Sequence, residues 1–232
     1  MNRIHRISHL GLVNTYLVAD DDGLTLIDAG LPGSRRRILA TARRLGAPIA
    51  RIAITHGHTD HVGGLDGLMA SLPGIELIAP EREAPLLRGE RELRDHEPQD
   101  RLRGGYPRIA SVPTRLVRDG DQVGSLRVVA TPGHTPGHVA FLDERDGTLY
   151  GGDVFTTVGG IATSAVVPWR FPLAGTATWS RELELESARM VRGLEPTRLA
   201  PGHGRVVEAP AEGMERAIAA AMHRAVASAL AG

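Results

Sequence analysis

The chain has 232 residues, and its 27 basic and 27 acidic side chains give a formal net charge of zero. This balance gives no electrostatic reason to expect nucleic acid or an anionic membrane surface as a partner. The sequence contains no cysteine, which excludes disulfides, a cysteine nucleophile and thiolate metal ligands. The N-terminal residues lack the apolar core of a signal peptide, and no apolar stretch is long enough to span a membrane. We therefore expect a cytoplasmic protein that acts on a small molecule. The sequence leaves the oligomeric state undecided, with a homodimer as one alternative.

The first third of the chain alternates predicted strands and helices. Two apolar runs on either side of the polar turn Asp20-Asp21-Asp22-Gly23 predict a hairpin of Leu12–Ala19 and Leu24–Asp28. Ser34 is a typical N-cap and Gly46 a typical stop for an amphipathic helix. The pattern continues with a strand at Arg51–Thr55, a helix from Gly64 to Ser71 and a strand at Ile75–Ala79.

Two stretches of the remaining chain depart from this alternation. Residues 81–108 are dense in Arg and Glu, which is typical of a solvated surface excursion after a short helix. Residues 154–178 are almost uncharged and predict a loop that lines a pocket. The other predicted elements are strands at Thr114–Val117, Leu126–Thr131, His138–Asp143, Thr148–Tyr150 and Arg198–Ala200, and helices at Trp179–Gly193 and Ala211–Leu230. Because no repeat or linker divides the chain, we predict a single domain over residues 1–232.

The segment His56-Gly57-His58-Thr59-Asp60-His61 places three imidazoles and a carboxylate directly after a predicted strand. Imidazole nitrogens and carboxylate oxygens are the ligands of Zn²⁺ and similar divalent cations. In such a tight turn, His56 and His58 can face one point while Asp60 and His61 face a second point nearby. Chance clustering at the surface is the alternative, but a cluster of this density favours a metal site.

Three later segments share one layout, in which an apolar strand is followed by a glycine-containing turn that carries one metal-type ligand. These ligands are His134, Asp153 and His203. In layered sheet proteins, ligands collect outside the carboxyl ends of strands, where loops from several strands converge. Together with the histidine-rich segment, these strand ends supply enough candidate ligands for two cations.

On these motifs, the sequence resembles the metallo-β-lactamase-fold superfamily from Leu26-Ile27-Asp28-Ala29-Gly30 to Pro201-Gly202-His203-Gly204. The resemblance implies a mixed α/β (α+β) fold, a four-layer αββα sandwich with two central sheets flanked by helices. It also implies a ligand assignment, in which His56, His58 and His134 hold one metal, Asp60, His61 and His203 hold a second, and Asp153 bridges the two. The expected cofactors are two divalent metal ions, Zn²⁺ ahead of Fe or Mn.

Two metal ions at this spacing predict a binuclear hydrolase, in which a metal-bridging hydroxide attacks an acyl carbon and Asp60 is the catalytic residue that can shuttle the proton. By resemblance, Asp153 argues against a β-lactamase, since those enzymes lack a carboxylate at the bridging position. Glyoxalase II-type thioesterases share the ligand set but add a basic C-terminal region, and lactonases place a tyrosine after the bridging aspartate, where this chain has Val154. We therefore expect a small, rather apolar ester, lactone or thioester as substrate.

Two other classes compete with the hydrolase. A mononuclear iron dioxygenase that acts on persulfides resembles the same fold and keeps the same residues while using only two histidines and the aspartate. A non-catalytic binding module predicts a broken ligand set, whereas every position is filled here. The dioxygenase is therefore the main alternative.

Several further residues are weaker candidates for the site. By resemblance, Asp28 supports a ligating histidine, against a structural role at the strand end. His138 is a candidate hydrogen-bonding partner of the site, although a structural role is favoured. Candidates for the floor of an apolar substrate pocket, with core packing equally expected, are Phe155, Trp169 and Phe171. Histidines expected at the surface are His5, His9, His96 and His223.

Overall fold

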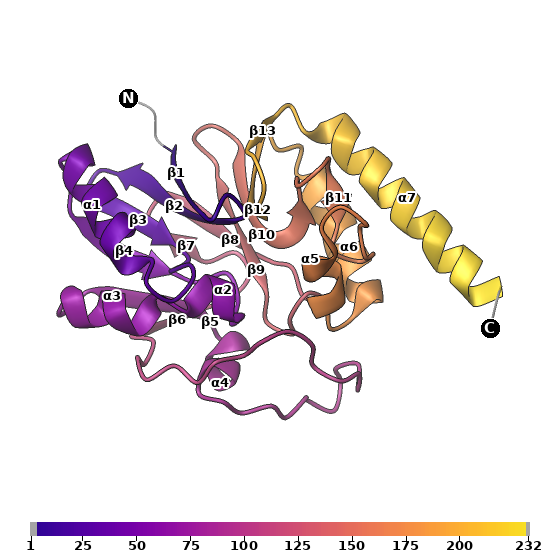
Figure 1. The fold of residues 1–232 in the computed structure, drawn as a ribbon, viewed down its shortest axis with the longest axis horizontal. Helices are drawn as coiled ribbons and strands as arrows, with labels where there is room; N and C mark the ends of the chain where they lie inside the picture. Colours follow the sequence, from indigo (N-terminus) through magenta and orange to yellow (C-terminus); the bar gives the residue numbers. More distant parts are fainter. Residues whose placement is uncertain (1–3, 231–232) are drawn as a thin grey trace.

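The computed structural model describes the backbone of residues 4–230 and the side chains of residues 4–227. Its centre is one curled β-sheet of 13 strands with helices on its outer sides (Figure 1). The strand order is β6-β5-β4-β3-β2-β12-β10-β9-β8-β7, and β1, β11 and β13 pair alongside β2, β10 and β12. The two halves of this sheet form the inner layers of the predicted αββα sandwich, so the two central sheets of the expectation are one hydrogen-bonded sheet.

The first half of the sheet carries the histidine-rich segment at one of its edges. Its strands are β1 (Ile4–His9), β2 (Val13–Asp20), β3 (Gly23–Ile27), β4 (Ile49–Ala53), β5 (Glu76–Pro80) and β6 (Arg115–Val117). The predicted hairpin is confirmed, because β2 and β3 pair antiparallel. Strands β3 to β6 run parallel to one another. Their carboxyl ends therefore meet at the same edge, where the loops can form a site.

The second half of the sheet supplies the other metal-type residues. Its strands are β7 (Gln122–Val123), β8 (Leu126–Ala130), β9 (Val139–Asp143), β10 (Thr148–Thr156), β11 (Ala162–Thr163), β12 (Arg198–His203) and β13 (Val207–Glu208). The halves join where His203 of β12 pairs with Val13 of β2. Asn14 Nδ2 and Tyr16 Oη donate to the Pro201 carbonyl over 2.9 and 2.6 Å, which reinforces this junction.

Helices complete the sandwich on both outer sides. They are α1 (Arg35–Leu45), α2 (Thr59–Val62), α3 (Leu65–Ser71), α4 (Glu83–Leu87), α5 (Pro172–Ala177), α6 (Arg181–Gly193) and α7 (Ala211–Leu230). Figure 1 shows α1 and α3 on one side of the sheet, α5, α6 and α7 on the other, and the far end of α7 extending beyond the body. Within the described residues, none of the helices has the length and apolar character that crossing a membrane requires.

Three buried clusters account for the layers. One joins the first half-sheet to α1 and α3 through residues such as Ile38 and Leu68. A second lies between the half-sheets, where the Tyr16 and Tyr150 rings meet edge to face with centroids 5.3 Å apart. The third packs the second half-sheet against α6 and α7, with Val191 among its buried residues. Burial of apolar surface on both faces of each half-sheet fixes the position of the strand ends that carry the site.

The structure corrects the expectations for the N-terminal region. Residues 4–9 form β1, which the polar sequence did not indicate. His9, expected at the surface, is buried, with its ring nitrogens 3.1 Å from Ser34 Oγ and 3.4 Å from Thr15 Oγ1. Ser34 stands at the start of α1 as predicted, but it makes no capping hydrogen bond because its hydroxyl is paired with His9 instead.

The stretch 154–178 is more ordered than the predicted loop. Strand β10 continues through Thr156, β11 pairs back onto it, and α5 forms near the end of the stretch. The strand predicted at Thr148–Tyr150 is therefore longer than expected, and Asp153 lies inside it rather than in a turn beyond it. The regular alternation of polar and apolar residues that marks a strand is absent here because every residue of β10 is buried.

Candidate metal centre

The seven predicted ligands come from four places along the chain and meet at the carboxyl ends of strands. His56 and His58 lie in the loop after β4, and Asp60 and His61 lie on α2. His134 follows β8, Asp153 lies in β10, and His203 is the last residue of β12. The parallel pairing of β10 with β12 brings Asp153 and His203 to the same edge. The structure thus brings all seven predicted ligands together.

Their donor atoms form overlapping groups, in each of which the atoms lie within 4.8 Å of one another. The groups are His56 with His58 and His134, His56 with His61 and Asp153, and Asp60 with His61 and His203. Asp153 lies between the outer groups, with Oδ1 3.3 Å from His61 Nε2 and Oδ2 3.1 Å from His203 Nε2. Its Oδ2 is also 3.3 Å from His134 Nε2. A carboxylate in this position can reach two cations at once.

Asp28 and Thr55 fix the rings of His61 and His56. The Asp28 carboxylate accepts from His61 Nδ1 over 2.7 Å and from the Thr55 hydroxyl over 2.8 Å. Because that hydroxyl donates to Asp28, it is free to accept from His56 Nδ1, which lies 3.0 Å away. Both histidines therefore carry a proton on Nδ1 and direct Nε2 toward the centre. Orienting a ligand ring in this way is the usual task of a carboxylate behind a metal site.

In each of the other three ligand histidines, a hydrogen-bond partner likewise fixes one ring nitrogen. His58 Nε2 lies 3.0 Å from the Arg103 carbonyl, and His203 Nδ1 lies 3.2 Å from the Leu12 carbonyl. Since a carbonyl only accepts, each of these ring nitrogens carries the proton. The Thr178 hydroxyl donates to the Ser164 carbonyl over 2.8 Å and faces His134 Nδ1 at 3.1 Å. In all five rings, the second nitrogen is left for the centre.

Unsatisfied buried atoms show that the centre fits metal ions. His56 Nε2, His61 Nε2 and Asp153 Oδ1 are buried and make no hydrogen bond with the described residues. Buried polar atoms without a partner are rare in native proteins and call for an explanation such as a bound ion. Imidazole nitrogens and carboxylate oxygens facing one small space are the donor set of a divalent cation. These residues therefore fit the divalent metal ions that the sequence predicts.

Charges within the protein divide the histidines into two groups. Burial holds the pKa of His56 and His134 well below the usual value and lowers that of His58 to about 4. Burial is also the largest single effect on His61 and His203, but the nearby carboxylates, Asp153 first among them, together outweigh it, which raises the pKa of His61 and brings that of His203 to about 9. The first group is neutral at pH 7, whereas the second must release protons to bind a cation.

The same attraction between histidines and carboxylates keeps the two carboxylates of the centre ionised. Burial alone would raise the pKa of Asp60 and Asp153, because it disfavours the charged form. The neighbouring His61 and His203 outweigh burial and hold the pKa of both carboxyls below the usual range. Both aspartates are therefore available as anionic ligands at neutral pH.

Asp28 and His138 occupy supporting positions around the centre. Asp28 has a positive φ of 60°, a conformation that aspartate tolerates better than most residues, and this turns its carboxylate onto Thr55 and His61. His138 Nε2 accepts from the Asp153 backbone N–H over 3.0 Å, while its Nδ1 lies 2.7 Å from Thr131 Oγ1. Burial lowers the pKa of His138 to about 3, so the ring is neutral and can accept this bond. His138 thus fixes the backbone of Asp153 rather than offering a ligand atom.

The three aromatic residues proposed for a pocket floor separate in the structure. Phe171 packs on the His203 ring with centroids 4.8 Å apart. Phe155 is 1% exposed in the cluster beneath α6 and α7, so it is part of the core. Trp169 is 80% exposed and lines a different cavity, beside α7. Only Phe171 of the three lies against the centre.

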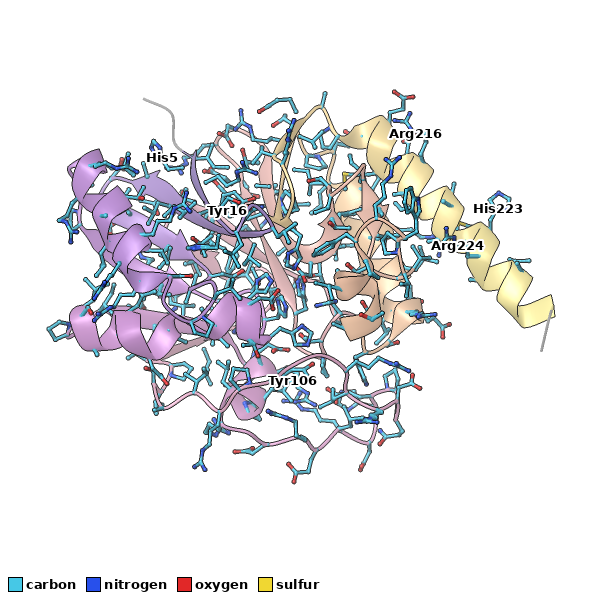
Figure 2. The ribbon with its side chains drawn as sticks, in the orientation of Figure 1. His5, Tyr16, Tyr106, Arg216, His223 and Arg224 are labelled. Atoms are coloured by element: carbon cyan, nitrogen blue, oxygen red, sulfur yellow. The ribbon has the colours of Figure 1, made fainter. Side chains whose placement is uncertain are left out.

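The charge-rich stretch 81–108, expected to be a solvated excursion, closes over the site. The Arg103 carbonyl holds His58, and the Gly105 carbonyl accepts from the Thr59 backbone N–H over 2.9 Å. The Tyr106 ring packs against His58 with centroids 4.6 Å apart, and Figure 2 shows Tyr106 beside α4. The sequence analysis missed this approach; the paired glycines at 104 and 105, within a polar run, are the signal that could have indicated it.

A pocket of about 330 Å³ opens onto the centre. Its metal-type lining residues are His58, Asp60, His134, Asp153 and His203. The rest of its wall comes from Thr59, Gly104 and Gly105 and from four residues of α5, which are Leu173, Ala174, Thr176 and Ala177. Among the described residues that line it there is no arginine. In contrast, His5 and His223 lie at the periphery, His5 on β1 and His223 on α7 (Figure 2).

Comparison with known proteins defines the family. The model of the metallo-β-lactamase superfamily matches residues 10–203, which is most of the chain. The chain therefore belongs to this superfamily, as its sequence motifs predicted. The fold agrees with solved structures: it matches TTHA1623, solved in a di-iron-bound form, with a TM-score of 0.65 and 25% identity over 90% of this chain and 96% of that one.

Three curated relatives show what the chain is similar to. The uncharacterized protein YobT of Bacillus subtilis is 44% identical over 89% of both chains. The probable metallo-hydrolase YflN of the same organism is 28% identical over 83% of this chain and 81% of its own length. The hydroxyacylglutathione hydrolase of Xanthomonas campestris is 33% identical over 62% of this chain, a match that spans 46% of that enzyme.

Proposed function

We propose that the chain is a binuclear metal-dependent hydrolase that cleaves a small, uncharged ester, lactone or thioester. The observation that carries this proposal is the convergence of seven donor side chains, with Asp153 between two groups of ligands. Each histidine has one nitrogen held by the protein and the other directed to the centre, as expected of a built site rather than a chance cluster. The relationship to metallo-hydrolases points to the same class of reaction.

The seven side chains have distinct roles in the proposed reaction. His56, His58 and His134 would hold one ion and Asp60, His61 and His203 the other, with Asp153 shared. When bound, two such ions polarise an acyl carbonyl and lower the pKa of water, so that hydrolysis proceeds near neutral pH. The Asp60 side chain is 32% exposed and lines the pocket, which places its carboxylate to orient a water molecule and take up its proton.

The pocket supports a small neutral substrate. At about 330 Å³, it is near the lower end of the range for ligand sites. Its wall beyond the metal-type residues is made of glycine backbone and the short side chains of α5, with Leu173 as the largest of them. A glutathione thioester carries two free carboxylates, and the described lining offers no arginine to pair with them. We therefore place lactones and short-chain esters and thioesters ahead of glutathione conjugates.

Steady-state assays on panels of lactones, thioesters, β-lactams and phosphodiesters test this proposal. We expect the highest kcat/KM on a lactone or a short-chain ester or thioester, and its loss after treatment with a chelator. Asp153→Asn is the matched negative control, because it keeps the shape of the side chain and removes the shared charge. Activity confined to phosphodiesters would contradict the proposal.

The metal content separates the hydrolase from a mononuclear iron dioxygenase of the same fold. We propose Zn²⁺ as the physiological ion, since its preferred ligands are present, although the relative TTHA1623 was solved with two iron ions. The Asp60 carboxylate lies 3.3 Å from His203 Nε2, and Asp28 holds the His61 ring. Both side chains are thus positioned for the second ion, which favours two ions over one. One iron per chain, together with oxygen uptake on glutathione persulfide, would identify the dioxygenase instead.

A further inference from the structure

Glu83, the first residue of α4, is a buried carboxylate that hydrogen-bonds to both of the ligand loops on one side of the centre. It is 0% exposed. Its Oε2 accepts from the Gly57 backbone N–H over 2.8 Å. Its Oε1 accepts from Thr135 Oγ1 over 2.6 Å and from the Gly137 backbone N–H over 2.9 Å. Both carboxylate oxygens are therefore satisfied by donors from segments that are far apart in sequence.

These donors stand directly beside the metal-type histidines. Gly57 lies between His56 and His58, and Thr135 follows His134. The carboxylate thus bridges the loop after β4 to the loop after β8. Hydrogen bonds to an ionised carboxylate are about twice as strong as those between neutral groups, and in a buried setting they are weakly screened. A shift of either loop would leave part of a buried charge unpaired, which is strongly unfavourable.

We propose that Glu83 is a positioning residue that sets the distance between these two loops and thereby the affinity of the ion held by His56, His58 and His134. This inference rests on the proposed binuclear function and deepens it by assigning a control element to one of the two ions. Burial raises the pKa of Glu83, and the hydrogen bonds from Thr135, Gly137 and Gly57 oppose that rise.

The second group of ligands depends on other partners. His61 is held by Asp28, and His203 by the Leu12 carbonyl. Asp60 and His61 lie on α2, whose backbone is hydrogen-bonded to Ala29, Gly30 and Gly105 rather than to Glu83. A change at Glu83 should therefore affect the two ions unequally. A side chain that served only the stability of the fold would show no such asymmetry.

The substitution Glu83→Gln keeps the shape of the side chain but replaces one acceptor oxygen with an NH₂ donor. Because all three partners are donors, the NH₂ of the amide must face either the Gly57 N–H or the Thr135 and Gly137 donors, and at least one hydrogen bond is lost. Glu97→Gln is the matched control. Its carboxylate, also close to α4, accepts three hydrogen bonds, from Arg82 Nε, Arg82 Nη2 and the Arg94 backbone N–H, and none from a ligand loop.

The test is a Co²⁺ titration of the full chain after chelator treatment, followed by absorption, with thermal unfolding recorded in parallel. We expect wild type and Glu97→Gln to bind two ions with unchanged affinities. In Glu83→Gln, one of the two ions should bind about 10–100-fold more weakly, as is typical when a partner behind a metal ligand is lost. Thr135→Ala, which removes a single donor, keeps the test valid if Glu83→Gln folds poorly, and it should weaken the same ion by less.

The outcomes separate the two proposals. If wild type binds two ions and Glu83→Gln binds both with wild-type affinity, or loses affinity equally at both, the role of Glu83 is overturned while the binuclear centre stands. A lower unfolding temperature with unchanged affinities likewise reduces Glu83 to a structural residue. A wild-type chain that binds no Co²⁺ contradicts the proposed function and, with it, the role of Glu83.

Discussion

Gly104 offers a direct test of how closely the stretch 81–108 covers the centre. Its φ is +83°, and a Cβ built on it would lie 2.8 Å from His58 Cε1 and 2.9 Å from Cδ2, with Nε2 closer still. To restore ordinary contacts near 3.4 Å, the two ring carbons of His58 must move by about 0.5–0.6 Å and the closer Nε2 by more. Metal–ligand distances tolerate changes of only about ±0.2 Å, so the substitution Gly104→Ala should displace one ligand from its ion.

Gly89→Ala separates this clash from backbone strain. Gly89 lies in the same stretch with a φ of +95°, and a Cβ there meets only the Arg108 side chain at 3.8–3.9 Å. Both variants should lose about 1–2 kcal/mol from the left-handed conformation, a fall in Tm of about 2–8 °C for a chain of this size. Gly104→Ala alone should bind one of its ions at least roughly tenfold more weakly. Equal metal affinity in the two variants, measured by Co²⁺ titration, would refute the placement of Gly104 against His58.

Three further predictions follow from the same geometry. Asp153→Asn should reduce the bound metal to one ion or fewer per chain and abolish hydrolysis, as metal analysis and steady-state assays can check; two retained ions would contradict a bridging role. Asp28→Asn removes an acceptor that His61 and Thr55 share, while asparagine tolerates the φ of 60°, so metal affinity should fall about 10–100-fold with little loss of Tm. Because the pKa of His203 is raised to about 9 and that of His61 in the same group of ligands is also raised, protons compete with the ion there, and affinity at that position should rise by at least roughly tenfold per pH unit between pH 7 and 9. The His58 position, with a pKa of about 4, should keep a constant affinity over the same range, and titrations at several pH values measure both.

The parts of the site that local sequence could predict are those that depend on strand ends. His56 to His61 follow an apolar strand, and His134 follows another, so the carboxyl-edge rule placed them correctly. The role of Asp28 came from family resemblance, and its hydrogen bonds to Thr55 and His61 agree with it. These features are local in sequence or repeat a known motif, which is why the sequence alone predicts them.

The parts that were missed depend on contacts between distant segments. Glu83 meets Gly57 and Gly137 only because α4 packs beneath two loops that are 26 and 54 residues away in sequence. Nothing in the Arg- and Glu-rich composition of its surroundings distinguishes this buried carboxylate from solvated ones. The sequence left Phe155 undecided between pocket and core for a related reason: β10 continues through it, and burial on both faces of a strand removes the alternation that would have revealed its direction.

The most direct test of the account is the metal content of the purified full-length chain, measured by elemental analysis alongside its hydrolytic activity. We expect two divalent ions per chain, both removed by a chelator together with the activity on a lactone, ester or thioester, and both restored by Zn²⁺. A single iron per chain with oxygen uptake on a persulfide, or hydrolysis that persists when no metal is bound, would contradict it.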